Sequence, residues 1–378
     1  MQLNPYPRGS ARPEKYLFGR AAEIQAIEHF AHEVQTRQAS DVLCFLAPAG
    51  LGKTSLLKLA RRRLQQRGWF CGYSEASSDA TTSMLDLLAD AGDALPPEGL
   101  GARFRSRLDE LSLTAGPVGI GFKLSAKADE ATSYTRLTRL LSGLGQLAIS
   151  GGVGVALIID EAQALPSADL ALLMRVVDRL DELPIAVLIG GLPRVPRRLI
   201  SSSDFASTQP NLWYETLSCL GPEDARDVLV VPAADAGCTL DPDALDLLTG
   251  FAAGHPLLLQ MAGSAAWRAA SQDASGGRVR ITAGHAEQAL SEAARQLTLA
   301  IYEPLWAVCS PPERQVLRLL APLCRDGQGA RLPELRAAGD GFVDTVLALA
   351  GNGIVWFRSP TRPVRLVLPG FADYILQR

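Results

Sequence analysis

A glycine-rich turn between an apolar segment and a helical segment constrains the fold of this chain more than any other feature. The sequence APAGLGKTS occupies residues 47–55 and overlaps the end of the apolar run 42–47. Gly50 and Gly52 allow the backbone to curl so that successive N–H groups point inward. A helix that begins near Lys53 adds the positive end of its dipole. The arrangement predicts a phosphate-binding loop between a strand and a helix of a parallel sheet.

The residue types in this turn match the chemistry of a nucleotide with a divalent cation. Lys53 supplies a charge to the β- and γ-phosphates, and the Thr54 hydroxyl ligates Mg²⁺. Ala47 stands where the motif has its first glycine, a position that ends the strand and that a small residue can occupy. A glycine-rich turn with no ligand is the alternative. The residues expected to contact the nucleotide here are Pro48, Ala49, Gly50, Leu51, Gly52, Lys53, Thr54 and Ser55.

A second motif supplies two carboxylates. The sequence VALIIDEAQ occupies residues 155–163, so a strand brings Asp160 and Glu161 to its carboxyl end, where open α/β sheets bind ligands. We expect Asp160 to hold Mg²⁺, directly or through water, and Glu161 to polarise the attacking water as a general base. Apolar runs that end in Asp-Glu are common, so this motif is informative only together with the first. Both together predict a Mg²⁺-ATP site and hydrolysis, with Lys53, Asp160 and Glu161 as catalytic residues.

The apolar pattern divides the chain into four segments. We expect an extended segment over 1–17, an α/β domain over 18–218, a helical lid over 219–308 and a winged helix-turn-helix over 309–378. The expected strands of the sheet are 42–47, 69–74, 153–159, 185–189 and 212–217. An insertion at about 95–131 separates the two motifs. Within it, residues 116–126 alternate between apolar and polar, which indicates either an extra edge strand or a hairpin used for contacts.

Composition excludes several classes of protein. The formal net charge is −3, so no global positive field indicates nucleic-acid binding. The N-terminal residues lack the apolar core of a signal peptide, and the apolar runs 153–159 and 185–192 are too short to span a bilayer. The six cysteines form no CxxC pair, which argues against a zinc site or a disulfide framework. We therefore expect a cytoplasmic protein with buried, reduced thiols and no membrane contact.

These motifs resemble the AAA+/STAND class of P-loop ATPases. More narrowly, the chain is similar to prokaryotic AAA-16 or origin-recognition-like ATP-binding proteins that end in a winged helix, and the similarity extends nearly from end to end. Besides the glycine-rich turn it rests on NPYPRG (4–9), LFGRAAEI (17–24), IIDEAQ (158–163), GGLP (190–193), LGPEDARDVLVVPA (220–233), AAGHPLLLQ (252–260) and GIVWFRSPTRPVRLVLPGFADYI (353–375). The implied fold is an α/β P-loop NTPase of the AAA+ type, a parallel sheet followed by a helical lid and a winged helix.

The resemblance also implies contacts to the base of ATP or ADP. Phe18, Gly19 and Arg20 would line the adenine side, whereas from sequence alone they equally form a turn that caps the helix beginning at Ala21. Pro256, in the segment Gly-His-Pro, would contact the nucleotide from the lid. A proline in this position is also typical of a helix start.

The chain departs from the family pattern at two places. Many relatives carry an arginine just before the fifth strand, but residues 205–217 contain none, so an arginine finger could be missing. Arg194, Arg197 and Arg198 either substitute for it or form a solvated helix start. Gly190 and Gly191 follow the fourth strand, where typical AAA+ enzymes have a polar residue. Both departures suggest slow turnover and the behaviour of a switch.

The expected winged helix lacks the side chains of a sequence reader. Its recognition helix, 341–351, contains no Lys, Arg, Asn or Gln, and Asp340 and Asp344 would face phosphates unfavourably. In the wing, Arg358, Arg362 and Arg365 could hold a DNA backbone but could not read sequence. We therefore favour a packing or autoinhibitory module over a DNA-binding one.

The sequence as a whole predicts an ATPase that acts as a slow molecular switch. Nucleotide would rearrange its domains and so gate an unknown protein partner or self-oligomerisation. One alternative is a DNA-binding AAA+ regulator of the replication or transposition type that oligomerises on DNA. Another is a nucleotide-binding scaffold that does not hydrolyse ATP.

Overall fold

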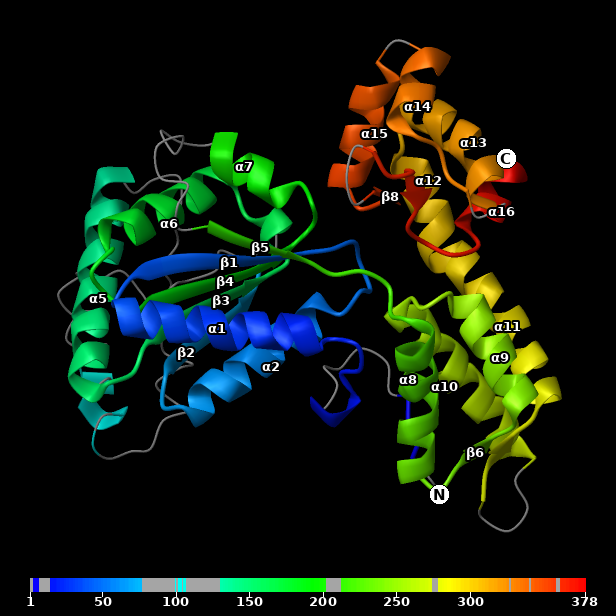
Figure 1. The fold of residues 1–378 in the computed structure, drawn as a ribbon, viewed down its shortest axis with the longest axis horizontal. Helices are drawn as coiled ribbons and strands as arrows, with labels where there is room; N and C mark the ends of the chain where they lie inside the picture. The colour runs from blue at the N-terminus through cyan, green and yellow to red at the C-terminus, as the bar shows by residue number, and fades with distance from the viewer. Residues whose placement is uncertain are drawn as a thin grey trace. The chain divides into compact units, whose positions relative to one another are not determined.

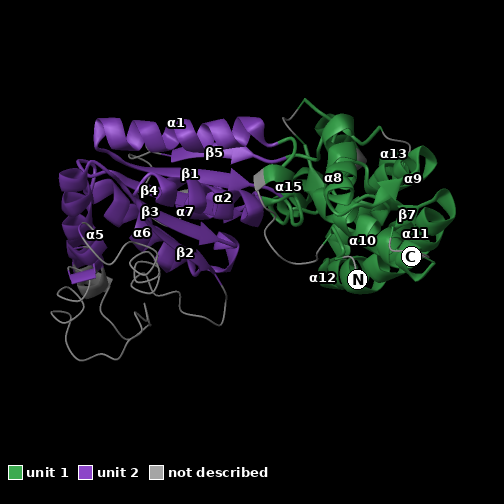
Figure 2. Ribbon diagram, turned by 90° about the horizontal axis from the view of Figure 1, so that it is seen from below, with its two compact units in different colours: residues 1–19, 48–52, 218–378 green, residues 20–47, 53–217 purple. Residues whose placement is uncertain are grey.

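A computed structural model of the chain contains two compact units, shown in Figure 2. Unit 1 comprises residues 1–19, 48–52 and 218–378, and unit 2 comprises residues 20–47 and 53–217. The structure describes residues 3–6, 14–76, 99, 101–103, 105–106, 130–201, 212–273, 278–325, 328–339, 341–357 and 361–378.

Unit 2 is built on a parallel five-stranded sheet. Its strand order is β2-β3-β4-β1-β5, and every neighbouring pair is parallel (Figure 1). The strands β1, β3 and β4 are buried along their whole length, as the continuous apolar runs predict. All five expected strands are confirmed. Their bounds are β1 (Ser40–Leu46), β2 (Phe70–Glu75), β3 (Val155–Asp160), β4 (Ile185–Gly191) and β5 (Leu212–Thr216).

Helices cover both faces of this sheet. The helices α1 (Ala21–Arg37) and α2 (Lys53–Gln66) contact the strands on the near face in Figure 1. On the other face, α5 (Glu130–Gly151) and α6 (Ser167–Arg179) share one apolar core with the strands. A short helix, α7 (Val195–Ser201), follows β4 and packs against α6. The α5 helix lies outside the predicted elements. The predicted strand at 116–126 lies outside the described residues.

The first part of unit 1 is helical, as predicted for the lid. It contains α8, α9 and α10, and the helix predicted for 283–305 is present but changes to a π-helix after Leu297. The bounds are α8 (Pro222–Asp235), α9 (Pro242–Ala252), α10 (Pro256–Gln272), α11 (Ala283–Leu297), the π-helix Thr298–Tyr302 and α12 (Glu303–Val308).

The N-terminal segment is anchored to these helices. Tyr6 is fully buried, and its hydroxyl donates to the carbonyl oxygen of Leu229 in α8 at 2.6 Å. The Asn4 amide donates to the Ser264 hydroxyl in α10 at 2.9 Å. A short 3₁₀ helix, Glu14–Tyr16, also contacts α8. The described part of the expected extended segment therefore packs against the lid helices.

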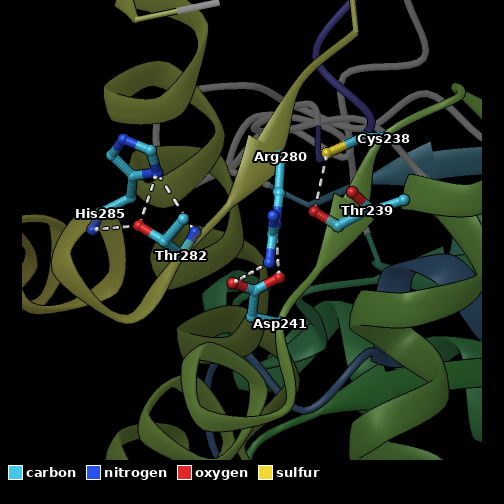
Figure 3. A network of polar contacts seen from close by, with 6 residues as sticks. All are labelled: Cys238, Thr239, Asp241, Arg280, Thr282 and His285. Carbon is cyan, nitrogen blue, oxygen red and sulfur yellow. Dashed lines mark hydrogen bonds and ion pairs between the residues drawn. The ribbon is translucent and has the colours of Figure 1, made fainter.

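Two very short parallel strands, which the sequence did not predict, pair within the lid (Figure 3). One lies between α8 and α9, and the other lies between α10 and α11. They are β6 (Thr239–Leu240) and β7 (Arg280–Ile281). The Arg280 guanidinium binds both carboxylate oxygens of Asp241, at 2.8 and 3.1 Å. Thr282 caps α11, because its hydroxyl accepts from the backbone N–H of His285.

The C-terminal part of unit 1 has the element order of a winged helix. Three helices precede a two-stranded antiparallel sheet, and this part shares one apolar core with the lid helices. The predicted division near residue 309 stays a prediction. Both strands are shorter than predicted. The bounds are α13 (Pro311–Arg325), α14 (Leu332–Ala338), α15 (Phe342–Gly351), β8 (Val355–Trp356), β9 (Arg365–Leu366) and α16 (Phe371–Leu376). None of the helices described combines the length and apolarity that a bilayer crossing needs.

Candidate nucleotide-binding site

The glycine-rich turn has the backbone that a phosphate-binding loop requires. It connects the end of β1 to the first residue of α2, and Gly50 and Gly52 have φ values of 79° and 97°. A side chain is strained at such angles, so both positions favour glycine. Ala47, in the place of the motif's first glycine, is buried and donates its N–H to Gly191 at 3.1 Å. Within this loop, Pro48 and Leu51 are buried and Ala49 is exposed.

Lys53 is a buried cation at the start of α2. Its side chain is held by the carbonyl oxygen of Ala47, to which Nζ donates at 2.8 Å. Burial lowers the pKa of Lys53, and the nearby carboxylates of Glu161 and Asp160 oppose that effect. The ammonium group is therefore held in place beside the two predicted acidic residues, as a phosphate ligand requires.

Asp160, the last residue of β3, is completely buried, and its carboxylate accepts three hydrogen bonds. Its Oδ2 accepts from the Thr54 hydroxyl at 2.5 Å and from the Tyr73 hydroxyl at 3.2 Å. Its Oδ1 accepts from the backbone N–H of Glu161 at 2.9 Å. The two predicted Mg²⁺ ligands, Thr54 and Asp160, are thus in contact.

Burial and the Asp160 carboxylate raise the pKa of Tyr73. The phenol therefore stays protonated at physiological pH and can donate to the carboxylate. No motif indicated Tyr73 as a residue of this site.

These oxygen donors fit Mg²⁺ better than a transition metal. Mg²⁺ takes few protein ligands and fills its octahedral shell with water and phosphate oxygens. Thr54 and Asp160 would supply one hydroxyl and one carboxylate oxygen. The parts of the chain that the structure describes contain no group of three or more His, Cys, Asp or Glu arranged around a metal position.

Glu161 adopts an unusual backbone conformation for a residue other than glycine, with φ 53° and ψ 37°. Such conformations cost free energy and occur preferentially at functional sites. The carboxylate of Glu161 accepts a hydrogen bond from the side-chain amide of Gln163. The other end of that amide, Oε1, accepts from the backbone N–H of Leu192 at 3.1 Å.

Close packing explains the two glycines at the end of β4. A Cβ atom at Gly190 would lie 2.8 Å from Oδ1 of Asp160 and 2.6 Å from Leu57. At Gly191 it would lie 2.6 Å from Val195 and 3.4 Å from Oε1 of Gln163. Side chains from neighbouring elements therefore fill the space where a side chain from β4 would lie.

The side chain of Arg198 is bound by backbone and hydroxyl oxygens of the same chain. Its guanidinium donates to the carbonyl oxygen of Gln163 at 2.7 Å, to that of Leu165 at 2.5 Å and to the Ser167 hydroxyl at 3.1 Å. Burial and the neighbouring Arg194 lower the pKa of Arg198. These contacts differ from a solvated helix start at Arg198, and an arginine finger among Arg194, Arg197 and Arg198 stays a prediction. The Arg197 side chain lies outside the described parts.

In unit 1, the Gly-His-Pro segment forms a tight turn between α9 and α10. Gly254 has φ 75°, and a Cβ atom there would lie 2.3 Å from the carbonyl oxygen of Leu220. His255 is the N-cap residue of α10 and Pro256 is its first residue, partly buried. This geometry bears out a helix start and leaves a contact between Pro256 and nucleotide as a prediction.

The same turn packs against the phosphate-binding loop, whose residues 48–52 belong to unit 1. The backbone N–H of Leu257 donates to the carbonyl oxygen of Gly50 at 3.3 Å. A Cβ atom at Gly50 would lie 2.7 Å from Cε1 of His255, so the imidazole ring packs directly on the loop. His255 is completely buried, and neither of its ring nitrogens has a hydrogen-bond partner among the described residues.

Burial has a direct effect on the charge of this histidine. It lowers the pKa of His255 to about 4, against a smaller opposing influence from the backbone of Ala49. The imidazole is therefore neutral at physiological pH.

The residues predicted for the adenine side occupy a turn before α1. Phe18 packs against the core of unit 1, and Gly19 has φ 64° with Asp224 beside it. In unit 2, Arg20 is buried at the start of α1 and its guanidinium pairs with Glu23 at 3.4 Å. These placements are compatible with a cap of α1 and do not test the predicted base contacts. Ser55 is partly buried in the first turn of α2.

The predicted DNA-contacting arginines are described in part. Arg362 and Arg365 are exposed, and Arg358 lies outside the described residues. The α15 helix, at the place of the recognition helix, carries Asp344 in its first turn.

Comparisons with known proteins agree with this geometry. Residues 16–189 match the family model of the AAA ATPase domain. No curated protein matches the sequence. Residues 16–189 are thus similar to an AAA ATPase domain, and the predicted resemblance to AAA+ P-loop ATPases is confirmed.

Several solved structures have a similar fold. One is the ORC2 protein of Aeropyrum pernix in ADPNP–ADP complexes, at 18% identity and a TM-score of 0.60, covering 100% of this chain and 98% of that one. Another is a Walker-type ATPase of Pyrococcus abyssi, at 15% identity and a TM-score of 0.59, covering 98% and 99%. A third is Cdc6p from Pyrobaculum aerophilum, at 15% identity and a TM-score of 0.50, covering 99% and 97%. The predicted α/β P-loop fold of the AAA+ type is thus confirmed, and the C-terminal winged helix stays a prediction.

Proposed function

We propose that this chain, whose residues 16–189 match an AAA ATPase domain, is a Mg²⁺-dependent ATP switch. ATP would bind at the loop 48–55, be hydrolysed slowly, and change the packing between that loop and the lid helices. The change would gate a protein partner or self-oligomerisation.

One observation carries this proposal: the phosphate-binding loop packs on the lid turn. Gly50 accepts from the backbone of Leu257, and the ring of His255 lies against Gly50. The same loop continues without interruption into Lys53 and Thr54. A phosphate that reorients the backbone N–H groups of the loop would therefore change what α10 packs against.

The residues of unit 2 would perform the chemistry. Lys53 would hold the β- and γ-phosphates, while Thr54 and Asp160 would hold Mg²⁺. Mg²⁺, when bound, neutralises charge that develops on the phosphate oxygens. Glu161 would orient a water molecule and accept its proton. We keep Phe18, Gly19 and Arg20 as proposed contacts on the adenine side, and Pro256 as a proposed contact to the nucleotide from the lid.

The contacts of Arg198 and the lack of arginine before β5 support slow turnover. Arg198 is bound to backbone carbonyls of its own chain, and residues 205–217 contain no arginine. A missing arginine finger lowers the rates of such enzymes by several powers of ten. We therefore expect the basal rate to lie below about 1 s⁻¹, the lower end of ordinary turnover numbers.

Two measurements on three variants test the proposal. Lys53→Ala should weaken ATP binding by at least about 100-fold, because one charge-assisted contact to phosphate is lost. Glu161→Gln should bind ATP normally and release phosphate at least about 100-fold more slowly. Glu182→Gln, a change at an exposed acidic residue of the same unit, is the matched control.

The rearrangement is tested separately by energy transfer between two dyes. The dyes are attached at two exposed positions, Asp178 of unit 2 and Leu247 of unit 1. Cys219 is replaced, because an exposed thiol would also react with a thiol-directed dye. With Glu161→Gln, ATP should change the transfer efficiency relative to ADP. Equal efficiencies with ATP, with ADP and without nucleotide would refute the switch. Hydrolysis with no change in efficiency would leave an ATPase without switching. If the wild type binds ATP but releases no phosphate, the chain is the scaffold that does not hydrolyse.

DNA binding is a second candidate, supported by the exposure of Arg362 and Arg365 at the β8–β9 end of unit 1. It would be independent of sequence, because these side chains reach phosphates and not bases. Fluorescence polarisation with duplex DNA should then show binding that weakens as salt increases. Binding that is unaffected when both arginines are replaced by alanine would exclude this surface.

The four-segment division and a cytoplasmic site of action remain proposals of the same kind. They rest on the apolar pattern and on the absence of paired cysteine motifs in the sequence.

A further inference from the structure

We infer that Gln163 is a positioning residue that sets the orientation of Glu161 and links it to the end of β4. The inference rests on the proposed role of Glu161 in hydrolysis. The sequence motifs assign no role to this side chain. All its contacts lie within unit 2.

Two hydrogen bonds fix the side chain of Gln163, and their chemistry leaves one orientation. Oε1 accepts from the backbone N–H of Leu192 at 3.1 Å, and Nε2 donates to the Glu161 carboxylate. A backbone N–H requires an acceptor and a carboxylate requires a donor, so an exchange of the amide oxygen and nitrogen would break both bonds. The amide therefore bridges the Glu161 carboxylate to the turn after β4.

The backbone around Gln163 is held equally firmly. Arg198 in α7 donates to the carbonyl oxygens of Gln163 and Leu165. The 3₁₀ turn that follows β3, Ala162–Ala164, is thereby tied to the helix that follows β4. Because Glu161 already has a left-handed backbone conformation, its side-chain direction depends on this turn.

Gly190 and Gly191 contribute no side chain at the end of β4, and Gln163 makes a polar contact there instead. Gly191 has no side chain, and Oε1 of Gln163 occupies the adjacent space, 3.4 Å from where a Cβ atom would lie. A polar group therefore reaches the end of β4 from a different element. Movement of the Leu192 backbone would be transmitted to Glu161 through one amide.

Three variants separate positioning of Glu161 from simple support of Leu192. Gln163→Ala removes both bonds. Gln163→Glu keeps the acceptor for Leu192 but places a second carboxylate against Glu161, and like charges so close repel. Gln66→Ala, at an exposed glutamine of α2, is the matched control.

We expect the turnover number to fall about 10-fold in Gln163→Ala, which is less than the whole contribution of a general base, and about 100-fold in Gln163→Glu, which is at the lower end of that contribution. The KM for ATP should stay within about 2-fold of wild type, because the phosphate contacts remain. Thermal stability of both variants should also remain close to wild type. The control should not change any of the three quantities.

The order of the two variants decides the outcome. If Gln163 only supports Leu192, Gln163→Glu should match wild type and Gln163→Ala should be the slower enzyme, which overturns the inference. Equal rates in both variants and wild type also overturn it. In either case the proposed ATPase activity stands, provided that wild type releases phosphate and Glu161→Gln does not. If Glu161→Gln is as fast as wild type, the proposed role of Glu161 and this inference both fail.

Discussion

Two buried titratable groups, one in each unit, have opposite surroundings. Asp160, at the end of β3, accepts three hydrogen bonds, from Thr54, Tyr73 and the backbone of Glu161. His255, at the start of α10, is buried to the same extent, yet its ring nitrogens have no hydrogen-bond partner among the described residues. The first side chain is surrounded by hydrogen-bond donors, whereas burial lowers the pKa of the second and keeps it neutral at physiological pH.

The difference indicates which region is assembled in advance and which is left adjustable. A buried carboxylate with all its donors in place is stable and fixed in direction. A buried imidazole with so little hydrogen bonding makes a net unfavourable contribution, because the desolvation of its nitrogens is only partly offset. We therefore expect the sheet unit to carry the fixed chemistry. We expect the lid turn, which packs on the loop at Gly50, to respond more easily to pH and to ligand.

The largest effect should come from removing the charge of Asp160. Asp160→Asn keeps the volume, but its single amide oxygen cannot accept both from the hydroxyls of Thr54 and Tyr73 and from the backbone N–H of Glu161. Hydrolysis should fall by at least about 100-fold, because the Mg²⁺ position loses its charged ligand. Phosphate release is measured beside Asp178→Asn, a change at an exposed residue of α6. Normal hydrolysis in Asp160→Asn would show that the satisfied carboxylate is structural only.

A substitution in the lid turn should have the next largest effect. Gly254→Ala would place a Cβ atom 2.3 Å from the carbonyl oxygen of Leu220, at a residue with φ 75°. We expect a loss of about 3 kcal/mol in the free energy of unfolding, from backbone strain and overpacking together. Gly250→Ala in α9, where a Cβ atom meets nothing within 4 Å, should instead be neutral or stabilising. Urea unfolding of both variants makes the measurement, and equal midpoints would mean that the turn adapts freely.

The charge state of His255 gives a prediction for pH. The pKa of His255 is lowered from 6.5 to about 4 in the folded protein, so the unfolded chain binds more protons between these values. The folded state should therefore lose stability as pH falls from 6.5 to 4, by up to about 3 kcal/mol. His255→Asn should remove this dependence, whereas His32→Asn, at an exposed histidine of α1, should not. Unfolding free energies at pH 7, 5.5 and 4.5 make the comparison, and parallel curves for wild type and His255→Asn would contradict it.

Much of the fold was predictable because its signals are local. The strands β1, β3 and β4 are continuous apolar runs, and α2 and α10 begin directly after glycine-containing turns. The phosphate-binding loop and the two acidic residues after β3 are likewise short motifs. Such patterns depend on a few neighbouring residues and on the rules of parallel sheets.

The remaining features depend on contacts between distant residues. Gln163 meets Leu192, and Tyr6 meets Leu229, across separations that no periodicity reveals. The strands β6 and β7 have two residues each, which is too short for an alternating pattern. Gly190 looked like the loss of a polar residue, whereas the structure shows a close approach that requires glycine. Tertiary packing decided each of these points.

The smallest predicted effect concerns the polar contacts of the lid drawn in Figure 3, in which Arg280 is exposed and Thr282 is partly buried. Thr282→Ala removes the side-chain cap of α11 and should cost about 1 kcal/mol, a typical value for an N-cap. Arg280→Ala breaks an ion pair whose arginine is largely exposed, and solvent should screen that loss until the unfolding midpoint barely moves. Urea unfolding of both variants beside wild type measures the difference. If Arg280→Ala proves more damaging than Thr282→Ala, the ion pair carries the β6–β7 link, and the lid depends on surface charges more than its buried groups suggest.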